Sequence, residues 1–179
     1  GGVEVLQLRA KGMSAEEITE MSREVLPLCR ARRVPFVVND FPEVAAAVGA
    51  DGVHLGQDDG SLEAARGLVG PDMLIGRSTH SPEQARAALA EGFDYLGFGP
   101  LFPTPTKEGR LGIGLENVRS VVEEIDGKAP VFCIGGINPT KLGEVLAAGA
   151  RRVVVVSALL QAEDVAGATQ AVRERLPGS

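Results

Sequence analysis

The sequence has only two cysteines, and their placement fits neither a disulfide framework nor a zinc site. Cys29 and Cys133 lie far apart, each inside an apolar stretch, whereas structural metal sites and disulfide scaffolds use closely spaced cysteines. Disulfide-rich folds belong to oxidising compartments. The lack of such a pattern favours a reducing, cytoplasmic location.

Basic clusters and long apolar runs are also missing. Eighteen lysine and arginine residues against 24 acidic ones give a formal charge of −6 with no basic cluster, which argues against a nucleic-acid surface or a polybasic membrane anchor. No apolar run approaches the roughly 20 residues of a membrane span, and the N-terminus shows no charged-then-apolar signal segment. We therefore expect a small-molecule substrate and neither a nucleic-acid nor a membrane partner. Whether the chain forms a homo-oligomer stays open.

What the sequence does contain is a repeat of short apolar segments separated by helical ones. Seven strands are expected, at residues 3–8, 35–38, 52–55, 74–76, 95–98, 130–134 and 152–156. Nearly continuous apolar strands that alternate with helices predict a parallel sheet, because parallel strands need crossovers and bury both faces. The predicted fold class is therefore α/β.

The helix boundaries support this repeat. Ser14-Ala-Glu-Glu17 and Ser81-Pro-Glu-Gln84 both fit a capping box, the second with a proline at the first helical position. Three helices run into a glycine just before the next strand, at Gly49, Gly92 and Gly149. These signals indicate one repeating βα unit.

Polar or glycine residues follow nearly every strand, and this favours a TIM (β/α)8 barrel over an open sheet. A site built from all the strand C-termini is the barrel arrangement, and no G-x-G-x-x-G follows the first strand. Seven βα units are one short of eight. We expect a single barrel domain over residues 1–179 with its first βα unit missing from this chain.

Gln7, Arg9 and Lys11 alternate at the end of the first predicted strand. A strand that continued through them would place all three on one face, and two fixed cations there would suit an anion. The alternative is a solvated strand exit with no ligand.

Acidic residues end the next two strands, as Asn39-Asp40 and as Gln57-Asp58-Asp59. Carboxylates on adjacent strands can meet, and magnesium takes one or two of them together with water and phosphate oxygens. The residue chemistry does not separate Asp58 from Asp59. The alternative is that these acids cap the following helices, because Asp favours helix N-termini.

Two further segments predict phosphate binding. Gly135-Gly136 and Ser157 follow the last two strands, where barrels commonly hold phosphate through backbone N–H groups. Residues 99–112 form the longest irregular stretch and contain Thr104, Thr106 and Lys107. Such a loop can act as a lid that brings donors to an anion and excludes water.

The two histidines predict different roles. His54 lies inside an apolar strand and is expected to be a hydrogen-bonded core residue. His80 follows a strand and could transfer a proton, although its surroundings also fit an ordinary helix approach. Cys133 is interpreted as core packing, because no histidine partner for nucleophilic catalysis is evident.

Taken together, these motifs resemble those of the thiamine-phosphate synthase family over essentially the whole chain. The matching stretches are Gln7-Leu-Arg-Ala-Lys11, Val38-Asn-Asp40, Gly52-Val-His-Leu-Gly-Gln-Asp-Asp59, Gly76-Arg-Ser-Thr-His80, Tyr95-Leu-Gly-Phe-Gly-Pro100, Pro103-Thr-Pro-Thr-Lys107, Ile134-Gly-Gly-Ile137 and Val155-Val-Ser157. The resemblance implies that hydroxymethylpyrimidine diphosphate is joined to hydroxyethylthiazole phosphate, giving thiamine phosphate and pyrophosphate by a Mg²⁺-assisted dissociative substitution.

The resemblance also implies a role for each matching residue. The pyrimidine and its diphosphate would be held by Gln7, Arg9, Lys11, Asn39 and Lys107, with Ser78 near the pyrophosphate. Asp40 and Asp59 would be the magnesium ligands. The thiazole phosphate would contact Thr104, Thr106, Gly136, Val156 and Ser157. Arg9, Lys11, Ser78 and Lys107 would be the catalytic residues.

Two other functions compete with this prediction. Arg77 also occurs in a sister group, the thiazole tautomerases, which use a histidine at the position of His80. An isomerase acting through His80 is therefore one alternative. A non-catalytic, phosphate-ligand-binding regulatory barrel is the other.

Overall fold

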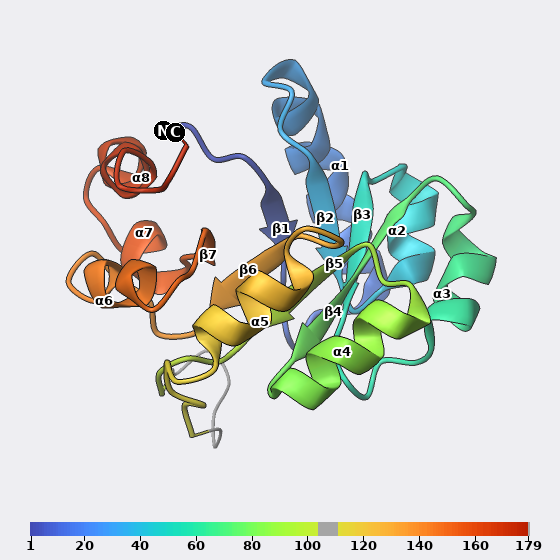
Figure 1. The fold of residues 1–179 in the computed structure, drawn as a ribbon. Helices are drawn as coiled ribbons and strands as arrows, with labels where there is room; N and C mark the ends of the chain where they lie inside the picture. The colour runs from blue at the N-terminus through green and yellow to red at the C-terminus, as the bar shows by residue number, and fades with distance from the viewer. Residues whose placement is uncertain (104–110, 179) are drawn as a thin grey trace. The chain divides into compact units, whose positions relative to one another are not determined.

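The structure, a computed structural model, describes residues 1–103 and 111–178. The chain divides into two compact units. We call residues 3–77 the N-terminal unit, and residues 1–2 together with 78–179 the C-terminal unit. The sequence order of the elements can be followed in Figure 1 by colour.

The N-terminal unit alternates strands and helices throughout. Its elements are β1 (Leu6–Leu8), α1 (Ala15–Ala31), β2 (Phe36–Asn39), α2 (Pro42–Val48), β3 (Gly52–Leu55), α3 (Leu62–Val69) and the first part of β4 (Leu74–Thr79). Strands β1 to β4 pair in sequence order and all in parallel. Helix α2 packs between α1 and α3 and covers β2 and β3 (Figure 1).

The C-terminal unit repeats the same pattern. After the end of β4 it contains α4 (Pro82–Glu91), β5 (Tyr95–Phe98), α5 (Val118–Ile125), β6 (Val131–Ile134), α6 (Leu142–Ala147), β7 (Arg152–Val154), α7 (Ser157–Leu160) and α8 (Val165–Arg173). Strands β5, β6 and β7 pair in parallel. The predicted α/β class with parallel strands is confirmed. A complete barrel with a missing first unit, forming one domain, stays a prediction.

Burial explains where the strands form. All four residues of β2 and of β3 are buried, as expected for parallel strands that are covered on both faces. The first predicted strand was wrong at its start: β1 is only three residues long, and Val3 and Val5 before it are each 42% exposed. An apolar sequence without neighbours to bury it does not become a strand.

The two predicted helix caps differ in detail. Ser14 makes a complete capping box with Glu17 at the start of α1. Ser81 caps α4 by accepting the Gln84 backbone N–H, but the Gln84 side chain accepts the N–H of His80 at 2.8 Å instead of the N–H of Ser81. The second box is therefore shifted by one residue, and it orients His80.

One buried acid ties three elements of the C-terminal unit together. The Asp126 carboxylate, whose side chain is 3% exposed, accepts the Val131 N–H at 3.0 Å and forms ion pairs with Arg151, at 3.5 Å, and Arg152. It therefore joins the end of α5 to the starts of β6 and β7. Asp51 has a smaller version of this role in the N-terminal unit, because its carboxylate accepts the N–H of Phe36 at the start of β2, at 2.8 Å.

Both cysteines are free and buried. Burial raises the pKa of the Cys133 thiol to about 12, so this residue packs in the core as the sequence indicates. Among the described residues, no helix is both long enough and apolar enough to cross a membrane.

Candidate functional site

Two acids of the N-terminal unit face each other just beyond the ends of β2 and β3. Asp40 directly follows β2, and its N–H donates to the His54 carbonyl of β3 at 2.9 Å. Its φ of 69° lies in the left-handed region, which is strained for a residue with a side chain. Asp59 closes a tight turn after β3, and its carboxylate accepts the Gly56 N–H at 2.6 Å. The Asp40 and Asp59 side chains are hydrogen-bonded to each other.

This contact shifts the pKa values of the two carboxyls in opposite directions. Burial, the hydrogen bond with Asp59 and the charge of Asp59 raise the pKa of Asp40 to about 6. Burial also acts to raise the pKa of Asp59, but the hydrogen bonds from Asp40 and from the Gly56 amide outweigh it, and the pKa of Asp59 is lowered. The pair therefore shares a proton below about pH 6, because two like charges so close together repel.

Three cations lie close enough to the acidic pair to affect its pKa values. The charges of Lys11 and Arg9 lower the pKa of Asp40, and those of Lys11 and Arg77 lower the pKa of Asp59. The first strand ends at Leu8, as predicted, and does not continue through residues 9 and 11, because residues 11–12 form a turn. The turn nevertheless brings Lys11 to the acids. Gln7 lies in β1 and is exposed.

The structure also bears on the alternative role of the acids. Helix α2 has Phe41 at its N-cap and α3 has Ser61, whose hydroxyl accepts the Ala64 N–H. Neither Asp40 nor Asp59 therefore caps a helix. Residue chemistry alone did not separate Asp58 from Asp59, and both are exposed. Asp59, which the family resemblance favours, is the one in contact with Asp40.

Arg77 affects the pKa of Asp59, although sequence reasoning assigned it no role in the site. Its guanidinium donates to the Gly60 carbonyl at 2.9 Å and to the Gln57 carbonyl at 3.2 Å. It therefore holds the turn that carries Asp59. Its place directly after the predicted strand at residues 74–76 was the signal available in the sequence. Asn39 ends β2, as predicted, and it is buried there.

A glycine turn follows β6 in the C-terminal unit. Gly135 and Gly136 have φ values of 104° and 65°, which residues with side chains rarely adopt. A Cβ on Gly136 would lie 2.8 Å from the Phe102 Cβ and 2.9 Å from the Pro103 carbonyl oxygen. The Phe102 N–H donates to the Gly135 carbonyl at 3.1 Å. The main chain of residues 100–103 therefore packs directly against the glycine turn, and a side chain at Gly136 would not fit there.

The other predicted residues of the C-terminal unit lie on separate elements. Ser78 is in β4, and its neighbour Thr79 is buried with its hydroxyl donating to the Gly97 carbonyl. Val156 is the N-cap of α7 and Ser157 its first residue. Thr104, Thr106 and Lys107 lie outside the described residues.

The histidines differ in their surroundings. His54 is buried in β3, as expected for a core residue. His80 is held at two points, because its N–H donates to the Gln84 side chain and its ring Nδ1 is hydrogen-bonded to the Gly99 carbonyl. A carbonyl only accepts, so Nδ1 carries the hydrogen.

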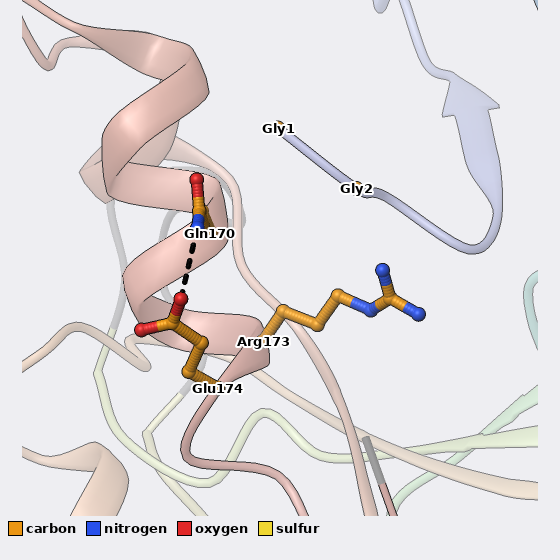
Figure 2. Close-up of a pocket in the computed structure, with 5 residues that line it drawn as sticks. All are labelled: Gly1, Gly2, Gln170, Arg173 and Glu174. Carbon is orange, nitrogen blue, oxygen red and sulfur yellow. Dashed lines mark hydrogen bonds between the residues drawn. The ribbon is translucent and has the colours of Figure 1, made fainter.

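A pocket of the C-terminal unit lies apart from the predicted residues. It is lined by Gly1, Gly2, Gln170, Arg173 and Glu174 (Figure 2). The dashed line in Figure 2 marks the hydrogen bond that the Gln170 side chain donates to the Glu174 carboxylate, at 2.9 Å. None of the predicted site residues lines this pocket.

Comparison with known proteins gives one consistent result. The family model for thiamine monophosphate synthase matches residues 1–159. The thiamine-phosphate synthase of Thermus thermophilus is 52% identical over 178 residues, covering 99% of this chain and 85% of the relative. That of Streptomyces avermitilis is 48% identical over 177 residues, covering 98% and 82%.

A solved structure agrees with these relatives. The thiamine phosphate pyrophosphorylase of Pyrococcus furiosus superposes with a TM-score of 0.87 at 41% identity, covering 97% of this chain and 83% of that one. Both the sequence matches and the structural match extend over nearly the whole chain. The chain therefore belongs to the thiamine monophosphate synthase family and is an enzyme of the transferase class.

Proposed function

We propose that this chain joins hydroxymethylpyrimidine diphosphate to hydroxyethylthiazole phosphate. The bond between the pyrimidine methylene carbon and the diphosphate oxygen breaks, and pyrophosphate leaves with the electron pair. The thiazole nitrogen then donates its lone pair to the methylene carbon, which forms the C–N bond of thiamine phosphate. The observation that carries the proposal is the Asp40–Asp59 pair, ringed by Arg9, Lys11 and Arg77, in a member of this family.

The acidic pair fits a magnesium ion. Asp40 and Asp59 present carboxylate oxygens, the ligands that Mg²⁺ prefers, and without a cation they share a proton below about pH 6. We assign these two residues as the ligands. The bound ion would neutralise charge on the departing diphosphate.

Arg9 and Lys11 would bind the diphosphate and stabilise the negative charge that grows as it leaves. Fixed cations at a developing charge lower the barrier without any reorganisation at the moment of reaction. Gln7 and Asn39 would orient the pyrimidine, and Ser78 and Lys107 would complete the diphosphate contacts. No step needs a general base, which agrees with the small number of candidate bases in the chain.

The glycine turn of the C-terminal unit would hold the thiazole phosphate. Gly136 brings its backbone into reach because it has no side chain, and Val156 and Ser157 would supply further contacts from the start of α7. Thr104 and Thr106 are assigned to the same phosphate. A single barrel domain, a cytoplasmic location and homo-oligomerisation stay predictions.

One observation favours a second candidate, the isomerisation of a thiazole carboxylate phosphate. His80 donates its Nδ1 hydrogen to the Gly99 carbonyl, so the neutral ring has its lone pair on Nε2, as a general base requires. This reaction would be independent of metal, and His80→Asn would abolish it.

The test is formation of thiamine phosphate from the two phosphorylated precursors, read as thiochrome fluorescence after oxidation. Wild type is expected to form product with Mg²⁺. EDTA and the Asp59→Asn variant should each abolish product formation. The control variant Asp58→Asn, which changes the neighbouring residue, should still form product. Product formation that is insensitive to both EDTA and Asp59→Asn would overturn the mechanism. Turnover of the carboxylate phosphate alone, lost in His80→Asn, would favour the isomerase.

A further inference from the structure

Lys141 and Phe102 form a contact in the C-terminal unit that the mechanism above does not use. The Lys141 ammonium lies 4.1 Å from the centre of the Phe102 ring. An ammonium over an aromatic face is attracted by the negative charge of the ring surface. Lys141 is the N-cap residue of α6, and Phe102 belongs to the segment between β5 and α5. The contact therefore joins two segments that are almost forty residues apart.

Phe102 is at the same time bound to the glycine turn. Its N–H donates to the Gly135 carbonyl at 3.1 Å, and Leu101 before it donates to the Ile134 carbonyl at 2.8 Å. A Cβ on Gly136 would come within 2.8 Å of the Phe102 Cβ. Phe102 thus covers Gly136 closely, and a displacement of Phe102 changes the space around that glycine.

The backbone at Lys141 is held by hydrogen bonds to Asn138 in the turn before α6. Its N–H donates to the Asn138 side-chain oxygen at 2.9 Å, and the Thr140 hydroxyl donates to the same oxygen at 2.6 Å. The next residue, Leu142, is fully buried, and its N–H donates to the Asn138 carbonyl at 2.9 Å. These bonds hold the Lys141 backbone in a position from which its ammonium reaches the Phe102 ring.

We propose that Lys141 is a positioning residue, which holds Phe102 against Gly136 and so maintains the shape of the thiazole-phosphate subsite. The proposal rests on the proposed function, which assigns that phosphate to Gly136. Lys141 acts through Phe102 and touches neither substrate. Its removal takes away the contact that holds the Phe102 ring at 4.1 Å, so the ring can shift relative to Gly136.

The test compares Lys141→Met with wild type in steady-state kinetics. A cation–π contact at a partly exposed site corresponds to about a two- to fivefold change in affinity. The KM for the thiazole phosphate is expected to rise by this factor, while kcat and the KM for the pyrimidine diphosphate stay within error. Lys141→Arg should restore the wild-type KM, because a guanidinium also binds to an aromatic face. The matched control, Lys128→Met, removes an exposed lysine of the same unit and should change nothing.

Phe102→Leu separates positioning from direct contact. It should raise the same KM, and adding Lys141→Met to it should cause no further rise. A further rise in the double variant would show that Lys141 contacts the ligand directly and would overturn the proposal. If wild type forms product and Lys141→Met has an unchanged KM for the thiazole phosphate, the positioning role is overturned and the proposed function is not affected.

Titration calorimetry with the thiazole phosphate supplies a readout that does not depend on turnover. The dissociation constant of Lys141→Met should rise by the same two- to fivefold factor, even if the chain forms no product. Equal constants would overturn the positioning role. If wild type neither binds this phosphate nor forms product, the proposed function and the positioning role both fall.

Discussion

The two compact units differ in the groups that they offer to a ligand. The N-terminal unit gathers charged side chains, with Asp40 and Asp59 in contact and three cations around them. The C-terminal unit instead offers backbone, at a glycine turn that Phe102 packs against without room for a side chain. The first arrangement suits a group whose charge changes during reaction, and the second suits a phosphate that only has to be held in place.

This difference separates binding from chemistry. Changes to the charged region should lower kcat, because its interactions strengthen as pyrophosphate leaves. Changes to the glycine turn should raise the KM for the thiazole phosphate and have a smaller effect on kcat. The opposite result would contradict these proposed roles. It would be a raised KM from changes to the charged region and a lowered kcat from changes to the glycine turn.

The largest effect is expected for Asp40→Ala. Loss of one carboxylate of the acidic pair should lower kcat by about a thousandfold, the size of effect seen when a group that stabilises developing charge is removed. The measurement is the thiochrome assay at saturating Mg²⁺ and substrates. Asp58→Ala is the control and should retain wild-type kcat, so an equal loss in both variants would point to misfolding.

The next effect is expected for Gly136→Ala. The new methyl group would meet Phe102 and Pro103 at under 3 Å, at a φ of 65°, and strain of this kind costs about 1–3 kcal/mol. The KM for the thiazole phosphate should rise by about tenfold to a hundredfold. Gly127→Ala is the matched control, because a Cβ there meets no atom within 4 Å. An unchanged KM in Gly136→Ala would show that the phosphate binds elsewhere.

A third comparison concerns the stability of the two units. Asp126→Ala removes a buried carboxylate that serves one N–H and two arginines, and we expect a loss of about 2–3 kcal/mol. Asp51→Ala removes one hydrogen bond to Phe36 and should cost about 1 kcal/mol. Urea unfolding with an unchanged m-value measures both. Equal losses would show that the arginine pairs contribute nothing.

The acidic pair also predicts how stability depends on pH. The folded-state pKa of Asp40 is about 6, above its ordinary 3.8, so the folded state binds more protons than the unfolded state between these values. Metal-free stability should therefore fall as pH rises from about 4 to about 6. Asp40→Asn should flatten this part of the melting-temperature profile, and Mg²⁺ should raise the wild-type melting temperature above pH 6. A rise in metal-free stability over the same range that is absent in Asp40→Asn would reverse the assignment.

Sequence patterns predicted the repeat well because they follow local rules. The capping box at Ser14 and the buried strand at Gly52–Leu55 depend on a few neighbouring residues and on apolar content. Strand starts were less predictable, because β1 begins only at Leu6 although the apolar residues Val3 and Val5 precede it. Pairing partners, which lie far away in sequence, decide where a strand begins.

The acidic pair shows the same limit. Residue chemistry placed Asp40 and an acid of the next segment together, and only the family resemblance favoured Asp59 over Asp58. The physical reason is the turn in which the Asp59 carboxylate accepts the Gly56 N–H. The role of Arg77 depends on carbonyls 17 and 20 residues away, at Gly60 and Gln57. Long-range hydrogen bonds of this kind leave no periodic trace in the sequence.

The smallest effect is expected at a residue without a role in either ligand site. Ser22 lies on the buried face of α1, fully buried, and its hydroxyl has no hydrogen-bond partner among the described residues. A buried hydroxyl without a partner is destabilising, and alanine is also the better helix former. Ser22→Ala should therefore stabilise the protein by about 1 kcal/mol, measured by urea unfolding, with kcat and both KM values unchanged. Ser120→Ala, at an exposed helical serine whose hydroxyl is bonded to Asn117, should give no such gain. A destabilised Ser22→Ala would mean that the hydroxyl has a partner, such as a buried water.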